Sequence, residues 1–424
     1  MATYVFLNVP AYGHVYPTLA VAHELVRRGE KVIYYLTEDF RASIEATGTT
    51  FRGYQSQMGK LKPPTNSILS QGNKVPNALP FMMVDESANV LPQVLESIRA
   101  EQPDYILYDM MCMWGKIVAR ALHIPAILFR PSYAANERFN MSTMNPGANN
   151  GIGSMAQNAA GSQQATPGFL AIFGQINGKL AQLCRTYDVA PFSAQEMFLG
   201  TEPLTIVFIP KEFQPGCETF DERFVFVGPS LQDRQDNHDF PLDKLVGKAI
   251  LYISLGTVFN NQAEFYTMCF AAFKDEPWLV VLSRGKNVDP ASLGPIPDNF
   301  LVLPHVPQLE VLQYTSIFIT HGGMNSTMES LYYGVPMVAV PQMPEQQMTA
   351  HHIQERGLGI ALDKNTVTAE QLRITVKQVM ADPAYRIRAQ AMQHYTRAAG
   401  GYKRAADAIM DFEQTHRQST PNKM

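Results

Sequence analysis

The sequence reads Phe318-Ile319-Thr320-His321-Gly322-Gly323-Met324-Asn325-Ser326-Thr327-Met328-Glu329 where a short apolar strand meets two glycines and a helix begins. The backbone N–H groups after Gly323 point outward at the positive end of that helix, so they form a binding site for an anion such as phosphate. Asn325 and Glu329 lie four residues apart on one helix face. The hydroxyls of Ser326 and Thr327 lie in the first turn, beside the free amides.

This stretch has two interpretations. In the first, a phosphate group binds to the amides, and Glu329, one turn deeper, accepts hydrogen bonds from ribose hydroxyls. In the second, the stretch is an ordinary strand-to-helix turn in which His321 caps the structure and Glu329 is a solvated helix residue. The twelve residues taken alone favour neither interpretation.

The flanking sequence favours the first interpretation. His305-Val306-Pro307-Gln308 lies upstream, and Pro341-Gln342-Met343-Pro344-Glu345-Gln346 lies downstream. Together with the central stretch, and in this order and spacing, these residues resemble the nucleotide-sugar signature of the inverting UDP-glycosyltransferases. The similarity to the bacterial macrolide-glycosyltransferase-like branch covers nearly the whole chain, from Gly13-His14 to Glu345-Gln346.

Length and composition set limits that do not depend on any motif. The chain has 424 residues, 46% of them hydrophobic, so two domains of roughly 200 residues each are expected. A net charge of −4 gives no basic surface for nucleic acid or anionic lipid. The four cysteines stand far apart, without a C-x-x-C pair, which is typical of a reducing cytoplasm and argues against a zinc site. No apolar run reaches the ~18 residues of a membrane helix, so we expect a cytoplasmic protein.

The N-terminal half predicts a parallel sheet. Residues 4–9 read as a buried strand, 10–14 as a turn, 17–29 as a helix and 31–37 as the next strand, which makes a βαβ unit. The pattern continues with helices at 40–47, 90–101 and 114–122, and with strands at 50–54, 104–108, 126–129, 204–209 and 224–227. We therefore expect a doubly wound α/β domain with its ligand sites at the carboxyl ends of the strands.

His14 and Asp109 both follow predicted strands, so both are expected at that edge of the sheet. An imidazole is suited to taking a proton from a hydroxyl at neutral pH, and a carboxylate behind it fixes the tautomer and stabilises the imidazolium. The alternatives are a loop histidine and an aspartate that caps a helix starting near Met111. In the resembling enzymes the matching residues are the general base and its partner. A Ser-His-Asp hydrolase is disfavoured because the chain has no G-x-S-x-G elbow.

The polar segment 140–168 is typical of a mobile loop or lid, and its Gly151-Ile152-Gly153 lacks the context of a dinucleotide fingerprint. The resemblance places the acceptor site in this first domain. Ordinary core or loop packing is the alternative for each candidate contact. The candidate acceptor residues are Tyr12, Phe81, Met83 and Tyr133, with Phe139, Met144 and Met155 as further candidates.

The C-terminal half predicts a second doubly wound sheet, after a polar, Pro-flanked linker at residues 229–241. Strands are expected at 249–255, 278–282, 300–303, 317–319 and 338–340, with a helix at 262–273. Gly256-Thr257 and Ser283 follow two of these strands, where an amide and hydroxyls can contact a phosphate. With His321 they form a ring of hydrogen-bond donors at the top of one sheet.

The resemblance implies the GT-B fold, in which two Rossmann-like doubly wound α/β domains face each other across a cleft. We expect an acceptor-binding domain at 1–228, the linker at 229–241 and a nucleotide-sugar domain at 242–395. Residues 396–424 are expected to form a helix that returns to the first domain, with a break at Gly400-Gly401 and a flexible tail. The oligomeric state is not predicted.

The resemblance also implies the reaction. We expect an inverting transfer, most readily of glucose from UDP-glucose, to a hydroxyl of a small hydrophobic acceptor such as a macrolide, polyketide or flavonoid. His14 is the expected base and Asp109 its partner. The UDP-sugar is a co-substrate, and no metal or other cofactor is expected, because the chain has no metal-ligand constellation. His321, Thr257 and the helix amides would then balance the charge of the leaving UDP.

The expected roles of the donor contacts are specific. Glu329 holds the ribose, Glu345 and Gln346 bind the sugar hydroxyls, and Val306 and Gln308 border the base. The candidate donor-binding residues are Gly256, Thr257, Ser283, Val306, Gln308, His321, Gly323, Asn325, Ser326, Thr327, Glu329, Glu345 and Gln346.

Two departures from the family pattern leave the donor open. His305 stands where many relatives have Trp, so the choice between uracil and thymine, and hence between UDP- and dTDP-sugars, is unsettled. Glu345 stands where Asp is more usual. Two other functions are alternatives. An NAD-dependent oxidoreductase is disfavoured by the missing G-x-G-x-x-G. A nucleotide-binding protein without turnover is disfavoured because the chain has His14, Asp109, Glu345 and Gln346 together.

Overall fold

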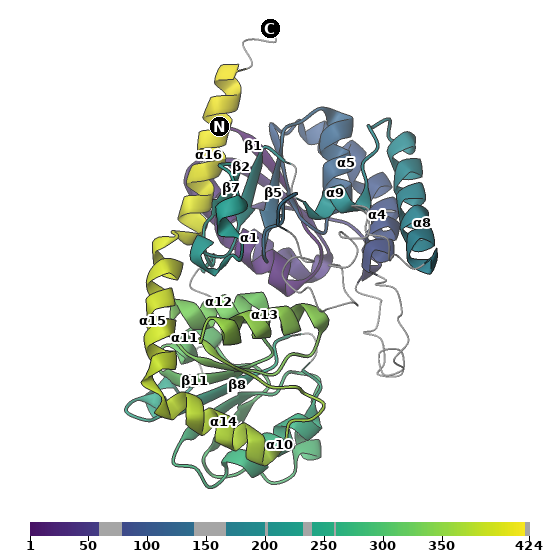
Figure 1. The fold of residues 1–424 in the computed structure, drawn as a ribbon. Helices are drawn as coiled ribbons and strands as arrows, with labels where there is room; N and C mark the ends of the chain where they lie inside the picture. Colours follow the sequence, from purple (N-terminus) through teal and green to yellow (C-terminus); the bar gives the residue numbers. More distant parts are fainter. Residues whose placement is uncertain (59–78, 140–166, 200–201, 232–239, 258–259, 420–424) are drawn as a thin grey trace. The chain divides into compact units, whose positions relative to one another are not determined.

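The computed structural model describes residues 1–58, 79–139, 167–199, 202–231, 240–257 and 260–419. The chain divides into two compact units, Met1–Ser230 together with Ala399–Met424, and Leu231–Ala398 (Figure 1). The boundaries between the units, at residues 230 and 398, lie close to the predicted domain ends at residues 228 and 395. The predicted polar loop with Gly151, Gly153, Met144 and Met155, most of the predicted linker and the last five residues lie outside the described ranges.

The first unit contains a parallel sheet of seven strands in the order β3-β2-β1-β4-β5-β6-β7. Its strands are nearly all apolar because both faces are covered by helices. The chain winds outward from β1 to β3 and then returns to β4, so the direction of winding reverses between β1 and β4. The strands are β1 Thr3–Leu7, β2 Lys31–Leu36, β3 Thr50–Gly53, β4 Tyr105–Asp109, β5 Ala126–Arg130, β6 Leu204–Val207 and β7 Phe224–Phe226.

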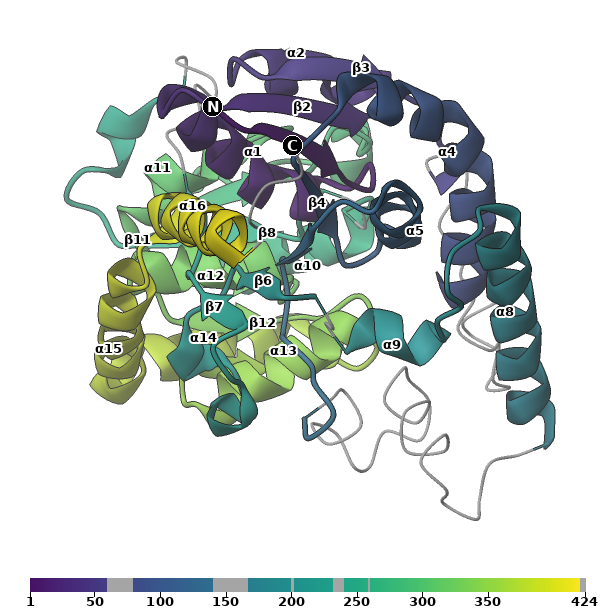
Figure 2. The ribbon, with the colours of Figure 1, turned by 90° about the horizontal axis from the view of Figure 1, so that it is seen from above.

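The connections between these parallel strands, which are right-handed in nearly all proteins, place helices on both faces of the sheet. Figure 2 shows α4, α5 and α8 on one side and α1 with α16 on the other. The helices are α1 Tyr12–Arg27, α2 Arg41–Glu45, α4 Leu79–Glu101, α5 Met113–Leu122, α8 Pro167–Thr186, α9 Ala194–Phe198 and α16 Gly401–Ser419, with short 3-10 helices η1 Glu38–Phe40, η3 Lys211–Phe213 and η4 Cys217–Thr219.

The predicted start of the first helix at residue 17 was wrong, because α1 begins at Tyr12. Ala11 has an extended N-cap conformation, and its carbonyl accepts hydrogen bonds from the N–H groups of His14 and Val15 at 2.9 and 3.0 Å. Pro17 lies inside the helix and has no N–H to donate. The bonds from His14 and Val15 hold the turn before it. His14 therefore lies in the first turn of a helix and not in a loop.

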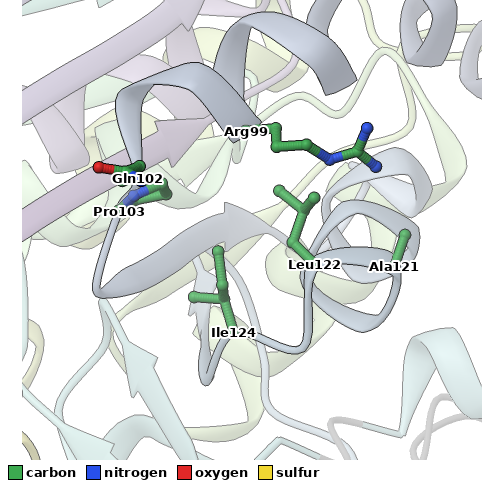
Figure 3. Close-up of a pocket in the computed structure, with 6 residues that line it drawn as sticks. All are labelled: Arg99, Gln102, Pro103, Ala121, Leu122 and Ile124. Atoms are coloured by element: carbon green, nitrogen blue, oxygen red, sulfur yellow. The ribbon is translucent and has the colours of Figure 1, made fainter. Parts of the chain in front are cut away.

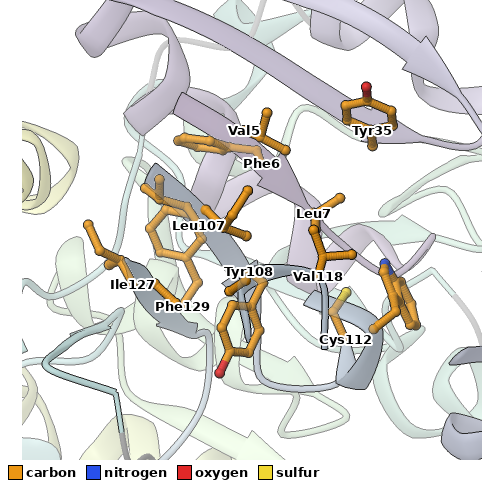
Figure 4. Packing of buried hydrophobic residues seen from close by; sticks show 14 of the residues in the cluster. Val5, Phe6, Leu7, Tyr35, Leu107, Tyr108, Cys112, Val118, Ile127 and Phe129 are labelled. Atoms are coloured by element: carbon orange, nitrogen blue, oxygen red, sulfur yellow. The ribbon is translucent and has the colours of Figure 1, made fainter. Parts of the chain in front are cut away.

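The core of the first unit is continuous around β1, β4 and β5 (Figure 4). The rings of Phe6 and Phe129, from β1 and β5, lie 5.2 Å apart, and Leu107 and Ile127 are fully buried beside them. Full burial of one such side chain stabilises a fold by about 1.5–3 kcal/mol relative to exposure. This packing fixes the positions of the strand ends, from which the candidate site residues follow.

Helix α16 belongs to the first unit, although it is the last element of the chain. Its Glu413 carboxylate accepts a hydrogen bond from the Tyr4 hydroxyl of β1, and Asp407 pairs with Arg28 at 2.6 Å. The N–H of Gly401 donates to the Val227 carbonyl at 2.7 Å. The predicted helix break at Gly400-Gly401 is confirmed, because the preceding helix ends at Ala398.

The second unit contains a parallel sheet of six strands in the order β10-β9-β8-β11-β12-β13. The order repeats that of the first six strands of the first sheet, so the winding reverses between β8 and β11. Strand β13 and helices α13 and α14 were not predicted. The strands are β8 Ile250–Ser254, β9 Leu279–Ser283, β10 Phe300–Leu303, β11 Thr315–Thr320, β12 Met337–Ala339 and β13 Gly359–Ala361.

The helices of the second unit cover both faces of its sheet. They are α10 Ala263–Phe273, α11 Gln308–Leu312, α12 Met324–Tyr332, α13 Pro344–Glu355, α14 Ala369–Ala381 and α15 Pro383–Ala398, with 3-10 helices η5 Leu242–Leu245 and η6 Pro290–Leu293. Within the described residues, no helix combines the length and the apolar character that crossing a membrane requires.

Candidate active site

His14 and Asp109 meet at the point where the winding of the first sheet reverses. His14 follows β1, Asp109 is the last residue of β4, and these two strands are neighbours in the sheet. The Nδ1 atom of His14 lies 2.8 Å from Oδ2 of Asp109. The Asp109 side chain is fully buried, whereas the His14 side chain is 22% exposed. Ligands of open α/β sheets bind at such a reversal, beyond the carboxyl ends of the strands.

Asp109 contacts both the imidazole of His14 and the backbone just before α5. It does not cap that helix, whose N-cap residue is Cys112 and which has no side-chain cap, so the capping alternative was wrong. Its Oδ2 contacts the imidazole, while Oδ1 accepts a hydrogen bond from the Met111 N–H at 2.8 Å, in the turn before α5. An ionised carboxylate only accepts hydrogen bonds, so the Nδ1 that faces it carries the proton. The lone pair of the neutral imidazole is then on Nε2, which is the nitrogen able to take a proton.

Asn8 fixes the backbone of His14, and the sequence analysis missed it. It is buried just after β1, and its Nδ2 donates to the carbonyl of His14 and to the hydroxyl of Tyr34, each at 3.0 Å. Its Oδ1 accepts from the Val9 N–H at 2.8 Å, and its own carbonyl accepts from the Tyr54 hydroxyl at 2.6 Å. The signal was present, since an asparagine in a run of buried apolar residues needs partners for its amide.

A buried cation adds to the electrostatics of this edge. Arg130, the last residue of β5, is 2% exposed and donates to the Tyr133 carbonyl at 2.9 Å. Burial lowers the pKa of the Arg130 guanidinium to about 10, and the negative charge of Asp109 acts against that shift. Arg130 therefore places positive charge in the neighbourhood of the Asp109 carboxylate.

The candidate acceptor residues differ in exposure. Tyr12 is 45% exposed in the same helical turn as His14, with its ring 5.0 Å from that of Phe40. Phe81 of α4 is half-buried. Met83 is fully buried in the core, and Tyr133 is buried and stacked on Phe213 at 6.0 Å. Their roles toward an acceptor stay predictions. Phe139 is also buried.

His321 occupies the corresponding place in the second unit. It follows β11, beside the turn at Gly256 that follows β8, where the winding of this sheet reverses. A Cβ atom built on Gly256 would lie 2.6 Å from the imidazole, and one built on Gly323 would lie 2.3 Å from it. Only glycines therefore leave space for this ring. Burial lowers the pKa of His321 to about 4, so the side chain is neutral at pH 7.

The N-terminus of α12 has no side-chain cap and adjoins buried polar side-chain atoms. Gly323 is the N-cap residue and supplies no side-chain cap, so the first amides of the helix have no capping side chain. Within the described residues, Nδ1 of His321 and the buried Oγ1 of Thr327 have no hydrogen-bond partner. Buried polar atoms of this kind normally have partners, and a bound anion with hydroxyl groups would supply them here.

Gln308 connects the donor candidates of α11 and α12. Its Nε2 donates to the Glu329 carboxylate at 2.5 Å and to the Ser326 hydroxyl at 3.3 Å, while its Oε1 accepts from the Tyr252 hydroxyl at 3.0 Å. Glu329 is only 3% exposed, so the alternative of a solvated helix residue was wrong. Val306 is also buried, and Asn325 is half-buried.

The remaining donor candidates lie at strand and helix ends. Glu345 is exposed and Gln346 half-buried in the first turn of α13, where Gln346 accepts a hydrogen bond from the Gln342 N–H at 2.8 Å. The Gln346 carbonyl would lie 3.2 Å from a Cβ on Gly322, so the start of α13 adjoins the glycine turn. Thr257 is exposed after β8, and the half-buried Ser283 ends β9.

A cavity of about 300 Å³ lies at the other edge of the first sheet (Figure 3). Its lining residues precede β4 and β5, so it opens at the amino ends of strands whose carboxyl ends lead to the candidate site. None of the predicted site residues lines it. The lining residues are Arg99, Gln102, Pro103, Ala121, Leu122 and Ile124.

Comparisons with known proteins identify relatives along nearly the whole chain. Residues 242–396 match the family described as UDP-glucoronosyl and UDP-glucosyl transferase. The NDP-glycosyltransferase YjiC of Bacillus licheniformis is 40% identical over 96% of each chain. The oleandomycin glycosyltransferase of Streptomyces antibioticus is 30% identical over 95% of this chain and 89% of its own.

A solved structure extends the similarity to the whole fold. The crystal structure of CalG4, described as the calicheamicin glycosyltransferase, superposes with a TM-score of 0.80 at 31% identity and covers 97% of this chain and 98% of its own. Both units are therefore matched, including the sheet that carries His14. The chain belongs to the UDP-glucosyl and UDP-glucuronosyl transferase family and is a glycosyltransferase of the GT-B fold that uses a nucleotide-sugar donor.

Proposed function

We propose that this protein transfers glucose from UDP-glucose, with inversion, to a hydroxyl of a small hydrophobic acceptor such as a macrolide, polyketide or flavonoid. The observation that carries the proposal is the 2.8 Å contact between His14 and the buried Asp109 at the reversal point of the first sheet. The names of the relatives support the class of acceptor, since one of them is an oleandomycin glycosyltransferase.

His14 acts as the general base. Its Nε2 takes the proton of the acceptor hydroxyl as that oxygen forms a bond to the anomeric carbon, and the bond from this carbon to the phosphate oxygen breaks. The configuration at the anomeric carbon inverts because the acceptor attacks opposite the leaving group. Asp109 stabilises the imidazolium, which later releases its proton to solvent. Positioned base catalysis contributes a factor of about 10²–10⁴ to the rate.

The second unit stabilises the leaving UDP without a metal ion. The first amides of α12 lie at the positive end of the helix and donate to the pyrophosphate. His321 is neutral at pH 7 because its pKa is lowered to about 4, so it acts as a neutral hydrogen-bond donor. Thr257 adds a hydroxyl beside it. These groups are fixed by the fold and need no reorganisation when negative charge develops.

The other donor candidates bind the nucleoside and the sugar. The Gln308 amide holds one oxygen of the Glu329 carboxylate, which orients the carboxylate for the ribose hydroxyls. Val306 and the Gln308 side chain border the base. In the first turn of α13, Glu345 and Gln346 contact the sugar hydroxyls.

A transfer assay tests the proposal. The purified protein is incubated with UDP-glucose or a dTDP-sugar and a panel of macrolides and flavonoids, and products are identified by a mass gain of one hexose. We expect transfer from UDP-glucose, with the inverted configuration visible by NMR. Binding of UDP without turnover of any acceptor would instead indicate a nucleotide-binding protein, and transfer from the dTDP-sugar alone would correct the donor.

Two histidine variants of α1 test the base. His14→Ala should abolish transfer while UDP still binds. His23→Ala is the matched control, because His23 lies on the same helix and its Nδ1 lies 3.2 Å from the Thr47 carbonyl oxygen. Transfer at an undiminished rate in His14→Ala would remove His14 from the mechanism.

A further inference from the structure

Asn260 is a buried asparagine that follows the turn after β8. It is 7% exposed, and its Nδ2 donates to the carbonyl of Gly256 at 2.7 Å. Its Oδ1 is buried and has no hydrogen-bond partner within the described residues. Its own carbonyl accepts from the Tyr266 hydroxyl and from the Gln262 N–H, each at 2.9 Å, so its backbone is held from the side of α10.

The same amide touches a second glycine turn. Gly285 follows β9 with a positive φ of +82°, and a Cβ atom built there would lie 2.5 Å from the Asn260 amide. Gly256 has a φ of +78° and lies against His321. Asn260 therefore joins the turns after two neighbouring strands, β8 and β9, and through Gly256 it adjoins the histidine that follows β11.

The peptide bond explains what this contact does. In a trans peptide the C=O of one residue and the N–H of the next point in opposite directions. The amide of Asn260 fixes the direction of the Gly256 carbonyl, and so it also fixes the direction of the Thr257 N–H on the other side of the same peptide plane. By holding the Gly256 carbonyl, the Asn260 amide orients the Thr257 N–H, although it does not contact that N–H.

We infer that Asn260 is a positioning residue for the nucleotide-sugar donor, which aims the Thr257 N–H and keeps the Gly256 turn against His321 so that both can meet the pyrophosphate. This inference rests on the proposed function of the second unit as the donor site. Asn260 does not itself need to contact the donor. Its loss should weaken binding of the diphosphate and leave recognition of the acceptor unchanged.

Asn299 supplies a matched control in the same unit. It is another asparagine whose Nδ2 donates to backbone carbonyls, those of Phe273, Glu276 and Trp278 at 2.9 to 3.2 Å, and whose Oδ1 is buried without a partner in the described part of the chain. It immediately precedes β10, at the amino edge of the sheet. The two asparagines therefore make comparable structural bonds, but only Asn260 lies at the edge with the glycine turns.

The experiment compares Asn260→Ala, Asn260→Asp and Asn299→Ala in the full chain. UDP affinity is measured by calorimetry, stability by urea unfolding, and KM separately for UDP-glucose and for the acceptor. Both Asn260 variants should weaken UDP binding about tenfold, which corresponds to ~1.4 kcal/mol, and raise KM for the donor but not for the acceptor. The aspartate has the same shape but cannot donate to a carbonyl, so it should not restore binding.

Asn299→Ala should lose stability and keep the affinity for UDP. The inference is overturned if Asn260→Asp binds UDP within about twofold of the natural protein, or if Asn299→Ala weakens UDP binding as much as Asn260→Ala does. Gly285→Ala gives an independent perturbation, since its methyl group displaces the Asn260 amide, and it too should weaken UDP binding. Because UDP binding is read separately from transfer, failure of the glucosyl-transfer proposal would be seen in the assay and not in these affinities.

Discussion

The six strands of the second sheet follow the order of the first six strands of the first sheet. A histidine lies at the reversal point of each sheet, His14 in the first and His321 in the second. The groups around these two histidines differ. His14 faces the buried carboxylate of Asp109 at 2.8 Å. His321 lies between two glycines, and its Nδ1 has no hydrogen-bond partner in the described part of the chain. The same topology therefore supports two different chemical roles.

Electrostatics explain the difference between the two rings. A neighbouring carboxylate favours the charged imidazolium, whereas burial without an opposite charge favours the neutral ring. His321 follows the second rule, since burial lowers its pKa to about 4. His14 is thus suited to accepting a proton during a reaction. His321 is suited to donating hydrogen bonds while it stays neutral. Each variant below changes one group around His14 or His321.

Asp109→Asn should have the largest effect. The amide keeps the shape of the side chain but not the charge that stabilises the imidazolium, so kcat should fall by about 10²–10³, as expected when a general base loses its partner. Steady-state kinetics at pH 7 measure the effect.

Asp104→Asn is the control for that variant. Asp104 precedes the same strand at its other end, where its carboxylate accepts from the Thr3 N–H at 2.7 Å. Its replacement should leave kcat unchanged. If Asp109→Asn retains kcat within about threefold, the carboxylate has only the structural role of accepting from Met111.

Gly256→Ala should have the next largest effect, because it acts on the surroundings of His321. Its φ is +78°, and a methyl group would lie 2.6 Å from the ring. Gly247 has a similar φ of +72°, but nothing lies within 4 Å of its Cβ position. Gly247→Ala therefore costs only backbone strain, about 1 kcal/mol of unfolding free energy, whereas Gly256→Ala adds roughly 2 kcal/mol from overpacking.

UDP affinity separates these two glycine variants further. Gly256→Ala should weaken UDP binding at least tenfold because the ring and the Thr257 amide move, and Gly247→Ala should not change it. Calorimetric titration and urea unfolding provide the two measurements. Equal losses of stability in the two variants, with UDP affinity retained in both, would show that His321 does not depend on this close contact.

A third prediction concerns the pH dependence of stability that His321 creates. Its pKa is about 4 in the folded protein and 6.5 when unperturbed, so between these values the unfolded chain binds the proton more readily. Stability from this group is therefore complete above pH 6.5 and is lost as the pH falls toward 4. Allowing for the partial exposure of the ring, the loss is on the order of 2 kcal/mol.

His321→Asn isolates that contribution, because asparagine does not titrate. Urea unfolding at pH 7 and at pH 4.5 should show that the natural protein loses more stability on acidification than the variant does. The other titrating groups cancel in the difference between the two proteins. Parallel losses in both would mean that His321 is not shielded from water as the structure indicates.

Much of this contrast could be predicted from the sequence. His14, Asp109 and His321 follow apolar runs that predict parallel strands, and the carboxyl ends of parallel strands meet at one edge, so their neighbourhoods follow from pattern alone. The strand order did not follow, because adjacency in a sheet depends on packing between distant segments. The shared reversal points were therefore visible only in the structure.

The supporting residues were harder to predict for a physical reason. Asn8 and Asn260 act through single hydrogen bonds to backbone carbonyls, and which carbonyl lies within reach depends on turn geometry. Met83 reads as a pocket candidate by type, yet it lies on the buried side of α4 and is fully buried. The start of α1 was misplaced because Pro17 predicts a helix start more strongly than the extended residue Ala11 does.

Asn8→Ala should have the smallest of these effects, and its size tests how the first site is built. Asn8 holds the carbonyl of His14 at 3.0 Å, but the orientation of the ring is set by Asp109, so kcat should fall only about fivefold to tenfold, near the ~1 kcal/mol of one hydrogen bond. Tyr34→Phe is the control, since it removes another partner of Asn8 and leaves the bond to His14 in place.

A loss of kcat in Tyr34→Phe as large as in Asn8→Ala would assign the effect to the stability of the hydrogen-bond network around Asn8. No loss in either would mean that the carboxylate alone positions the base.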